Sequence, residues 1–395
     1  MPGMKTKNFA VATIAALLFL PSAAFAADLE VSGWIPYWRA KEGIAAATKH
    51  LDELDVVNPF AFAVKRDGSL KDEAKLSKSQ WKRLFRAARK EDVLVIPTIM
   101  SGDGALIHDI LSDEDARAEH VAAIVEMVED GEYDGVDIDY EGKRAATRPY
   151  FSAFLEELAA ALDGKELSCT VEARTPPEAL YRDVPKNIEY SNDYEVISRV
   201  CDRVNIMTYD QMRADLEENS AKKGEPYFPV ADVDWVRKVA ELALEDIPAE
   251  KIHLGVATYG REHEVTVEPE WYRSYDQLWA FNPGYAEKLA KKKKIEPFRA
   301  KSGEAAFSYF ADKKLARKMA KVDVPAGTPE GLRAAAQALA HANETGDSVV
   351  VNYLTWSDAE AVAQKVALAR ELGLAGVAVF KIDGGEDKEI WGELD

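Results

Sequence analysis

The sequence is poor in the residues that build disulfide frameworks and metal centres. It has only two cysteines, Cys169 and Cys201, and six histidines among 395 residues. Two cysteines cannot staple a small secreted scaffold, and the histidines show no H-E-x-x-H pair or comparable ligand spacing. We therefore expect no metal and no other cofactor. The cysteines lie in or just before two consecutive predicted strands, and either a bridge between them or two reduced core thiols fits this placement.

Basic residues are outnumbered by acidic ones. The chain contains 50 Lys and Arg against 69 Asp and Glu, which gives a formal charge of −19. Such a surface repels nucleic acid and anionic lipid, so we expect neither as a partner. An acidic surface is also what keeps many exported proteins soluble.

Long apolar runs are confined to the N-terminus. Lys5 and Lys7 precede an apolar stretch from Phe9 to Leu20, and Ala24-Phe25-Ala26 follows it. This arrangement predicts a signal peptide over residues 1–26, because the run is shorter than the roughly 20 residues that span a bilayer. We expect a secreted, periplasmic or cell-envelope protein without stable membrane insertion after cleavage; an uncleaved anchor is the alternative.

Apolar runs rich in β-formers alternate with amphipathic helical stretches, which is typical of a parallel sheet with crossover helices. No G-x-G-x-x-G follows the first run, and eight such units favour an α/β fold of the (β/α)₈ TIM-barrel type over an open sheet. The predicted strands are Glu30–Pro36, Val56–Val64, Val93–Met100, Gly135–Tyr140, Leu167–Ala173, Arg203–Tyr209, Ile252–Thr258 and Gly376–Ile382.

The predicted domain, residues 27–395, is longer than the roughly 250 residues that such a barrel needs. The excess lies between the seventh and eighth strands, at about residues 263–352. It contains β-like pieces at Ala305–Phe310 and Ser348–Leu354 and a helical pattern at Glu330–Ala342. We expect a small α+β insertion on the catalytic face, with Lys291–Lys294 as a solvated helix end.

Three acids recur at alternate positions of the predicted fourth strand. The segment Asp134-Gly135-Val136-Asp137-Ile138-Asp139-Tyr140-Glu141 places Asp137, Asp139 and Glu141 on one face. The apolar residues between them face the other way. In a barrel the acids would face the axis, with Glu141 at the C-terminal rim where barrel enzymes keep their active sites. Stacked carboxyls cannot all ionise, which raises the pKa of the outermost, as a general acid requires.

This segment resembles the D-G-x-D-x-D-x-E signature of glycoside hydrolase family 18, the chitinase-like family, at every defined position. Met207-Thr208-Tyr209-Asp210 is similar to the family's M-x-Y-D, and the ends of the second and seventh strands and the insertion are also alike. The likeness spans the mature chain and is nearest to bacterial spore-cortex-lytic and peptidoglycan-directed members. It implies hydrolysis of glycans that contain β-linked N-acetylglucosamine.

The resemblance also implies substrate-assisted retaining catalysis, an exception to the two-carboxylate scheme. Glu141 would protonate the glycosidic oxygen while the substrate's acetamido oxygen attacks the anomeric carbon. Asp139 would hold the acetamido nitrogen, and Asp137 would modulate Asp139 by sharing a proton. Tyr209 would donate toward the acetamido oxygen, and Asp210 would contact the sugar. Asp134 has the opposite parity and is expected to have a structural role.

Strand ends supply further candidates for glycan contacts, because sugar rings stack on aromatic side chains. For each aromatic, core packing is an equal alternative. Phe380 departs from the tryptophan that the family commonly has on its last strand, which puts subsite strength in doubt. Arg174 and Arg213 follow strand ends and fit substrate polar groups, acidic peptide stems or surface ion pairs, of which we favour surface ion pairs. The substrate-binding candidates are Asp210, Met207, Trp34, Tyr37, Trp38, Phe60, Phe62, Tyr259 and Phe380.

Two functions of different class fit these features. The first is a catalytic N-acetylglucosaminidase or chitinase-like hydrolase; the second is a catalytically weak or inactive glycan-binding protein on the same fold. Glu141, which inactive members typically lack, favours the enzyme. The sequence leaves open chitin, peptidoglycan or N-linked glycan as substrate, internal or terminal cleavage, and the oligomeric state.

Overall fold

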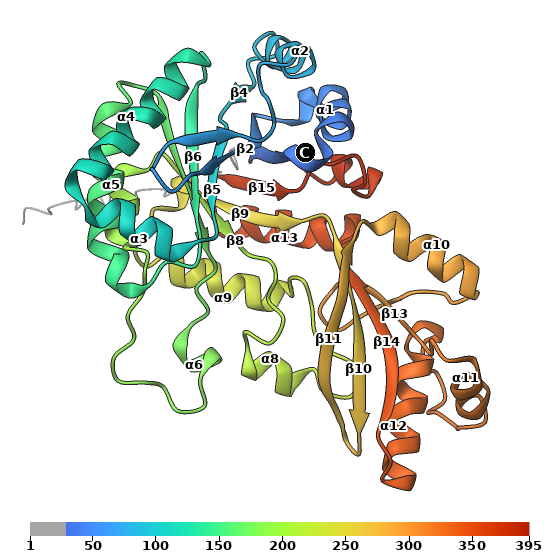
Figure 1. Cartoon of the computed structure of the whole chain (residues 1–395). Helices are drawn as coiled ribbons and strands as arrows, with labels where there is room; N and C mark the ends of the chain where they lie inside the picture. Colours follow the sequence, from blue (N-terminus) through green and yellow to red (C-terminus); the bar gives the residue numbers. More distant parts are fainter. Residues whose placement is uncertain (1–28, 395) are drawn as a thin grey trace, which may run out of the picture.

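The computed structural model describes residues 29–394, and its larger part is a barrel of parallel strands surrounded by helices (Figure 1). The order is β1-β15-β9-β8-β7-β6-β5-β2, and β1 also pairs with β2, which closes the barrel. The predicted α/β class and (β/α)₈ barrel are therefore confirmed, whereas the expected signal peptide lies outside the described residues. The barrel strands are β1 (Glu30–Pro36), β2 (Val56–Val64), β5 (Thr98–Ser101), β6 (Gly135–Tyr140), β7 (Glu166–Glu172), β8 (Arg203–Met207), β9 (Ile252–Ala257) and β15 (Gly376–Phe380).

Many of the helices between these strands begin at an aspartate whose carboxylate accepts hydrogen bonds from free N–H groups of the first turn, which stabilises the helix start. The aspartates are Asp103, Asp113, Asp193, Asp215, Asp232 and Asp358. The helices are α1 (Ala40–Lys49), α2 (Ser79–Ala88), α3 (Gly104–Ser112), α4 (Glu114–Asp130), α5 (Arg148–Ala161), α6 (Pro177–Leu180), α7 (Tyr194–Val200), α8 (Leu216–Ala221), α9 (Val233–Ala243) and α13 (Ala359–Glu371). Within the described residues no helix is long and apolar enough to cross a bilayer.

The third predicted strand, Val93–Met100, is divided in two. β4 (Leu94–Val95) and β5 both pair with β2, but Ile96 and Pro97 interrupt the ladder between them. Proline has no N–H to donate, so a strand through it loses a hydrogen bond. The Pro97 carbonyl still accepts a hydrogen bond from Asp137 N at 3.0 Å, which keeps this segment joined to β6 beside Asp137. A short strand, β3 (Leu70–Asp72), pairs antiparallel with the end of β2.

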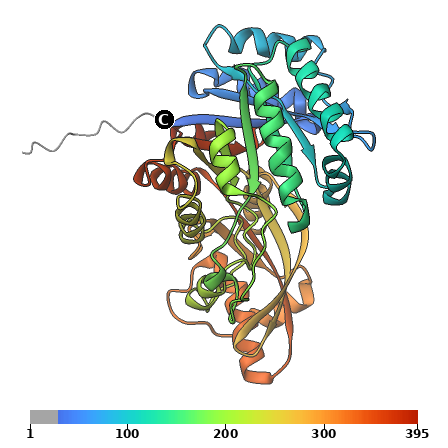
Figure 2. The same ribbon diagram turned by 90° about the vertical axis from the view of Figure 1, so that its left-hand side faces the viewer.

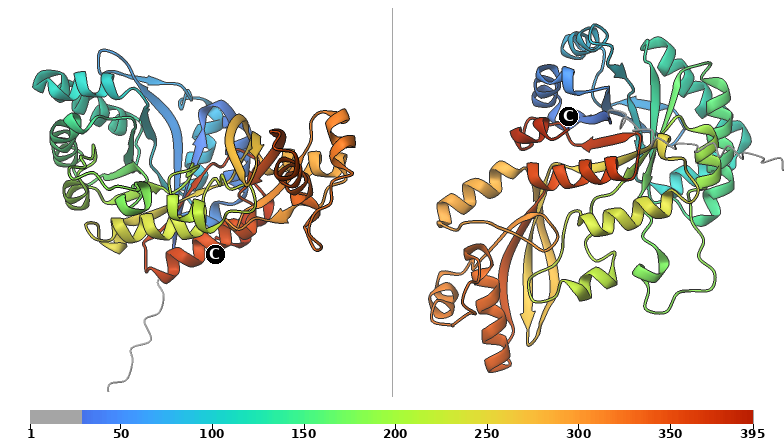
Figure 3. Two further views of the ribbon diagram at one scale, coloured as in Figure 1. Left: turned by 90° about the horizontal axis from the view of Figure 1, so that it is seen from below. Right: turned by 180° about the vertical axis from the view of Figure 1, so that it is seen from behind.

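The expected α+β insertion lies between β9 and β15. It is a five-stranded antiparallel sheet in the order β11-β10-β14-β13-β12, with helices on one side. Figures 2 and 3 show it standing beside the barrel. Lys291 to Lys293 end α10, and Lys294 caps it in the left-handed conformation, as the solvated-end reading predicts. Its elements are β10 (Gly260–Glu268), β11 (Trp271–Phe281), α10 (Pro283–Lys293), β12 (Phe298–Arg299), β13 (Ala305–Tyr309), α11 (Lys313–Met319), α12 (Arg333–Thr345) and β14 (Val349–Trp356).

The long β10–β11 hairpin was not predicted. β11 is an edge strand whose residues from Asp276 to Ala280 are exposed, so its sequence lacks the apolar alternation of a half-buried strand. Only its pairing with β10 makes it a strand. This hairpin nevertheless forms one wall of the cavity beside the acids, as described below.

The barrel strands separate two environments. On β6, the side chains of Val136, Ile138 and Tyr140 are fully buried in the main apolar core between strands and helices. The alternate positions face the barrel interior, where buried polar side chains gather instead. Asp134, at the strand entrance, accepts a hydrogen bond from Val95 N at 2.8 Å, which is the structural role expected for it.

Candidate active site

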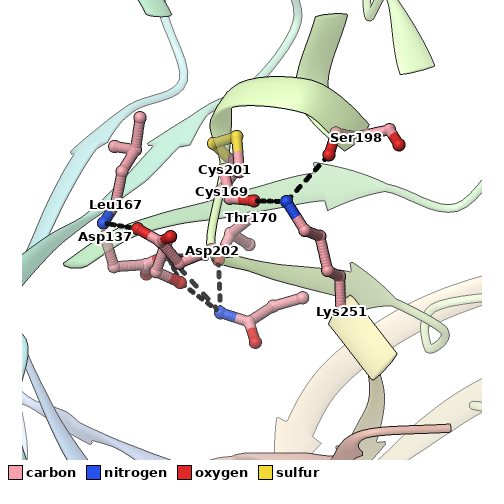
Figure 4. The surroundings of a disulfide bond; sticks show 10 residues. Asp137, Leu167, Cys169, Thr170, Ser198, Cys201, Asp202 and Lys251 are labelled. Atoms are coloured by element: carbon pink, nitrogen blue, oxygen red, sulfur yellow. Dashed lines mark hydrogen bonds between the residues drawn. A yellow bond between two sulfur atoms is a disulfide. The ribbon is translucent and has the colours of Figure 1, made fainter. Parts of the chain in front are cut away.

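Asp137 forms the buried base of the acid column. It is completely buried, and donors from four neighbouring strands surround its carboxylate. Burial raises the pKa of Asp137, and these hydrogen bonds oppose the rise. Figure 4 shows Thr170 beside it on β7. The donors are Trp34 Nε1 (3.2 Å), Thr98 Oγ1 (2.8 Å), Ser168 Oγ (2.9 Å), Thr170 Oγ1 (2.8 Å) and Asn205 Nδ2 (3.5 Å).

Asp139 is the middle acid and differs from Asp137 in having no donor. It is 4% exposed, and its buried Oδ1 has no hydrogen-bond partner among the described residues. Burial and the charges of Glu141 and Asp137 raise the pKa of Asp139 well above its usual value, while Lys143 opposes them. Burial without a donor favours the neutral form of a carboxyl. Asp139 is therefore free to exchange hydrogen bonds with a group that enters from the rim.

Glu141 stands at the mouth of the column. Its N–H donates to Ser101 O at 2.8 Å at the end of the β6 ladder, and its side chain reaches solvent. Partial burial and then the charge of Glu172 raise its pKa, with a smaller contribution from Asp210. Glu141 is thus neither turned into the helical shell nor sealed from the rim. A raised pKa at an accessible carboxyl is what a proton donor needs.

Tyr209 and Asp210 follow the end of β8. The Tyr209 ring stacks on Phe380 with centroids 5.6 Å apart, and its pKa is raised well above the usual value, mainly by burial. Asp210 accepts from Tyr259 Oη at 2.8 Å and pairs with Arg261 at 2.6 Å. The Tyr209 hydroxyl is therefore a neutral hydrogen-bond donor. The charges of Asp139 and Glu141 also raise its pKa, which indicates that it lies near these two acids.

A cavity of about 460 Å³ is lined by Asp210, Tyr259 and Arg261, whereas the three acids of the column are not among its lining residues. Phe380 lines this cavity, and its ring contacts those of Trp34, Phe60, Tyr209 and Tyr259 at centroid distances of 6.0, 6.1, 5.6 and 6.2 Å. Half-exposed Trp38 also lines it. The insertion supplies the opposite wall through Arg261 on β10 and Ala280 and Phe281 on β11. An acidic rim beside an aromatic floor is suited to a sugar ring.

A model of glycosyl hydrolases family 18 matches residues 32–385. The chain belongs to glycosyl hydrolase family 18. The expected resemblance is therefore confirmed, and membership makes the protein a glycoside hydrolase.

Similar proteins include cortex-lytic enzymes and a chitinase. The cortical fragment-lytic enzyme of Bacillus anthracis is 25% identical over 349 residues, 87% of this chain and 68% of that protein. The spore cortex-lytic enzyme SleL of Bacillus cereus superposes with a TM-score of 0.67 at 20% identity, over 93% of this chain and 74% of SleL. A chitinase from Chromobacterium violaceum superposes with a TM-score of 0.66 at 19% identity, over 93% and 98%. These structures share the barrel fold.

One predicted substrate-binding residue of this family 18 chain, Phe62, lies away from the cleft. The register of β2 against β5 shifts between Phe60 and Phe62. An irregularity of this kind changes which face the next side chain occupies. Phe62 therefore packs in the outer core and lines a hollow with Phe85 and Tyr133, so its expected role in substrate binding is withdrawn.

The other strand-end candidates lie on the cleft side. Tyr37 packs edge-on against Trp38 at 5.0 Å and is partly buried. Met207 is partly buried at the end of β8, level with Glu172 on β7. Arg174 lies between Tyr190 and Tyr194, 3.7 and 3.8 Å from their ring centroids. That stacking gives Arg174 a structural position instead of the surface ion pair expected for it.

Two residues beside Glu141 were missed by the sequence interpretation. Glu172 accepts from Gly142 N and Asn192 Nδ2, both at 2.9 Å, and so fixes the backbone that follows Glu141. Lys143 is buried, donates to the Tyr140 carbonyl and lies 3.8 Å from Glu172. Glu172 alternates along β7 with Ser168 and Thr170, whose side chains face the barrel interior, so strand periodicity could have predicted its position. Lys143 gave no such signal, because its burial depends on α5.

Among the described residues one group of three carboxylates has the spacing to hold a metal: Glu218, Asp232 and Asp234. The ammonium of Lys222 pairs with all three, at 3.3 Å from Glu218 and 2.8 Å from Asp234. A resident lysine charge satisfies these acids, so the group is an ion-pair network. The acid column of the family 18 site uses none of these residues.

Proposed function

We propose that this chain is an exported hydrolase that cleaves β-linked N-acetylglucosamine-containing glycans by substrate-assisted retaining catalysis. The observation that carries the proposal is the contrast along the column: Asp137 is saturated with donors, Asp139 has none, and Glu141 reaches the rim. A buried, unpartnered Asp139 below a proton donor is suited to a substrate that brings its own amide.

Each acid has a separate task in this mechanism. Glu141 transfers its proton to the glycosidic oxygen as the acetamido oxygen attacks the anomeric carbon. Asp139 accepts the acetamido N–H, which holds that group in line and stabilises the oxazolinium as the cation develops. No hydrogen bond joins Asp137 to Asp139 here, so Asp137 acts through its charge, which contributes to the raised pKa of Asp139. Tyr209 donates toward the acetamido oxygen, and Phe380 supports the sugar ring.

Substitution of Glu141 by Gln tests the role of the proton donor. We expect hydrolysis to fall by about 10²–10⁴-fold, which is the usual contribution of general acid catalysis. Glycan binding should persist, because the amide keeps the shape of the side chain. The measurement is initial rate on chitooligosaccharides together with calorimetric binding. Hydrolysis at the wild-type rate by E141Q would refute the assignment, and binding without hydrolysis in the wild type would indicate a glycan-binding protein.

Peptidoglycan and chitin both contain the required acetamido sugar. Similar proteins include a cortical fragment-lytic enzyme and a chitinase, and these point to both classes. Product analysis with chitooligosaccharides and purified peptidoglycan in parallel separates them. Phe380 in place of tryptophan leaves a smaller stacking surface, which favours a substrate that gains affinity from contacts outside the cleaving subsite.

Export is supported by the N-terminal sequence and by one structural feature. Cys169 and Cys201 form a disulfide, so of the two alternatives left open by the sequence, the bridge is present and the reduced thiols are not. Structural disulfides persist in oxidising compartments and are rare in the cytosol. We propose cleavage of residues 1–26 and action outside the cytoplasm.

A further inference from the structure

A second cavity, of about 430 Å³, lies between the loops that follow β7 and β8 and the β10–β11 hairpin. Arg182 comes from the first loop, Arg213 and Lys223 from the second, and Trp271 and Tyr275 from the hairpin. The proposed mechanism uses none of these side chains.

Its three cationic side chains have no acidic partner within 4.0 Å among the described residues. Arg182 and Lys223 are exposed, and no contact holds either charged group. Arg213 donates to the Arg273 carbonyl, and its guanidinium lies 5.2 Å from the Tyr275 ring centroid. In a chain with 69 acids against 50 bases, three unpaired cations around one cavity run against the overall charge. They favour an anion locally where the rest of the surface repels it.

Two acids also line this cavity, but neither neutralises the cations. Glu225 is buried, and its carboxylate accepts from Lys301 N at 2.5 Å. Burial raises the pKa of Glu225, which favours its neutral form. Glu270 is exposed in the β10–β11 turn, where its backbone N–H donates to Asn343. The aromatic side is open as well, because Trp271 is 56% exposed.

The cavity continues the line of the proposed substrate cleft. Ala280 on β11 lines the cleft and Tyr275 on the same strand lines the second cavity, five residues or about 17 Å away at 3.4 Å per residue. Arg213 follows Asp210 by three residues, and Gln277 between the two cavities accepts from Arg261, which pairs with Asp210. A glycan chain bound at the acids can therefore reach both.

We propose that this cavity binds a carboxylate-bearing substituent on the same N-acetylated glycan; the inference rests on the proposed function. The planar fork of an arginine matches a carboxylate, and lysine adds a point charge. Trp271 offers an apolar face to a sugar ring or an aliphatic segment. The shared chemistry is a carboxylate, supplied either by a lactyl ether on the sugar or by a peptide attached to it.

The test compares three substrates with the full mature chain. They are glycan fragments with peptide stems, the same fragments after an amidase has removed the stems and left the lactyl carboxylate, and neutral chitooligosaccharides. The R182Q/K223Q variant changes two exposed side chains that make no structural contact. We expect kcat/KM on stem-bearing fragments to fall about tenfold, mainly through KM, since a charged hydrogen bond contributes more than a tenfold factor at most sites. The neutral substrate should change less than twofold.

The controls separate this inference from the proposed function. R83Q/K90Q removes two exposed charges, one from α2 and one from the turn that follows it, and should change none of the three rates. Loss on the amidase-treated fragments alone assigns the lactyl carboxylate, loss on stem-bearing fragments alone assigns a peptide carboxylate, and loss on both shows that the cavity accepts either one. A variant with the wild-type ratio of anionic to neutral hydrolysis overturns the inference. Absence of hydrolysis of every substrate by the wild type would instead contradict the proposed function.

Discussion

The buried position of Asp139 suits its proposed catalytic role but lowers the free energy of unfolding. A carboxyl without a donor in a buried column keeps its proton in the folded chain but loses it readily in the unfolded one. The raised folded-state pKa means that Asp139 disfavours folding increasingly as pH rises above the unfolded value, and this effect is absent at low pH. Active sites commonly accept such a cost in stability for reactivity.

Substitution of Asp139 by Asn should therefore stabilise the protein while abolishing its proposed mechanism. We expect the free energy of unfolding at pH 8 to rise by about 1–3 kcal/mol, because the amide cannot ionise in the unfolded chain and each tenfold change in proton affinity on folding corresponds to about 1.4 kcal/mol. The gain should shrink as pH falls toward the usual aspartate pKa of about 3.9, because Asp139 then becomes protonated in the unfolded chain as well. Urea denaturation from pH 4 to 8 measures this, with the exposed Asp109→Asn as control. A gain that is the same at every pH would contradict the raised pKa.

At the scale of single residues, side-chain parity was the reliable signal. It placed Asp137, Asp139 and Glu141 on one face because the period of a strand is a local property. It failed at Phe62, where a register shift reverses the face. Lys143 could not be found this way, since its burial depends on packing against α5.

At the scale of elements, the disulfide joins strands that hold the acid column. Cys169 on β7 lies next to Thr170, whose hydroxyl binds Asp137, and Cys201 ends the helix that leads into β8. Lys251 reinforces the junction by donating to the Ser198 and Cys201 carbonyls at 2.9 and 2.8 Å (Figure 4). The bridge closes a segment that contains the whole loop after β7 and α7.

Removal of this bridge should lower stability more than activity. A sequence separation of 32 residues corresponds to roughly 3–4 kcal/mol of unfolded-state entropy, so C169A/C201A should lose about that much free energy of unfolding. Thermal denaturation with and without reductant measures it: reductant should lower the midpoint of the wild type and leave the variant unchanged. Two titratable thiols in the denatured, unreduced wild type would show that no bridge forms.

At the scale of the whole molecule, the insertion is tied to the barrel by a buried carboxylate. Glu304, just before β13, is completely buried and accepts from Val230 N at 3.1 Å, Ala231 N at 2.7 Å and Thr355 Oγ1 at 2.7 Å. Lys365 of α13 contributes a favourable charge, and its own Nζ has no hydrogen-bond partner among the described residues. The insertion wall of the cleft is thereby fixed relative to the acids.

Substitution of Glu304 by Gln should uncouple the two parts. The amide offers one acceptor to several donors and leaves the buried Lys365 charge uncompensated, so we expect a loss of about 2–4 kcal/mol in free energy of unfolding. Glu287→Gln, an exposed site on α10, is the matched control and should change it by less than about 0.5 kcal/mol. Denaturation followed by circular dichroism measures both. Equal stability of the two variants would show that Glu304 contributes nothing to the junction.

The sequence alone determined the features that depend on neighbours along the chain: the order of the barrel strands and the helices between them, the place of the insertion, and the three acids with Glu141 last. These follow from strand period, helix patterning and one signature, all of which are local. The tertiary structure decided which aromatics surround Phe380, that Cys169 meets Cys201, and that Arg182, Arg213, Lys223 and Trp271 share a cavity. Such contacts join residues far apart in the chain, and their formation depends on barrel closure, register and the docking of the insertion.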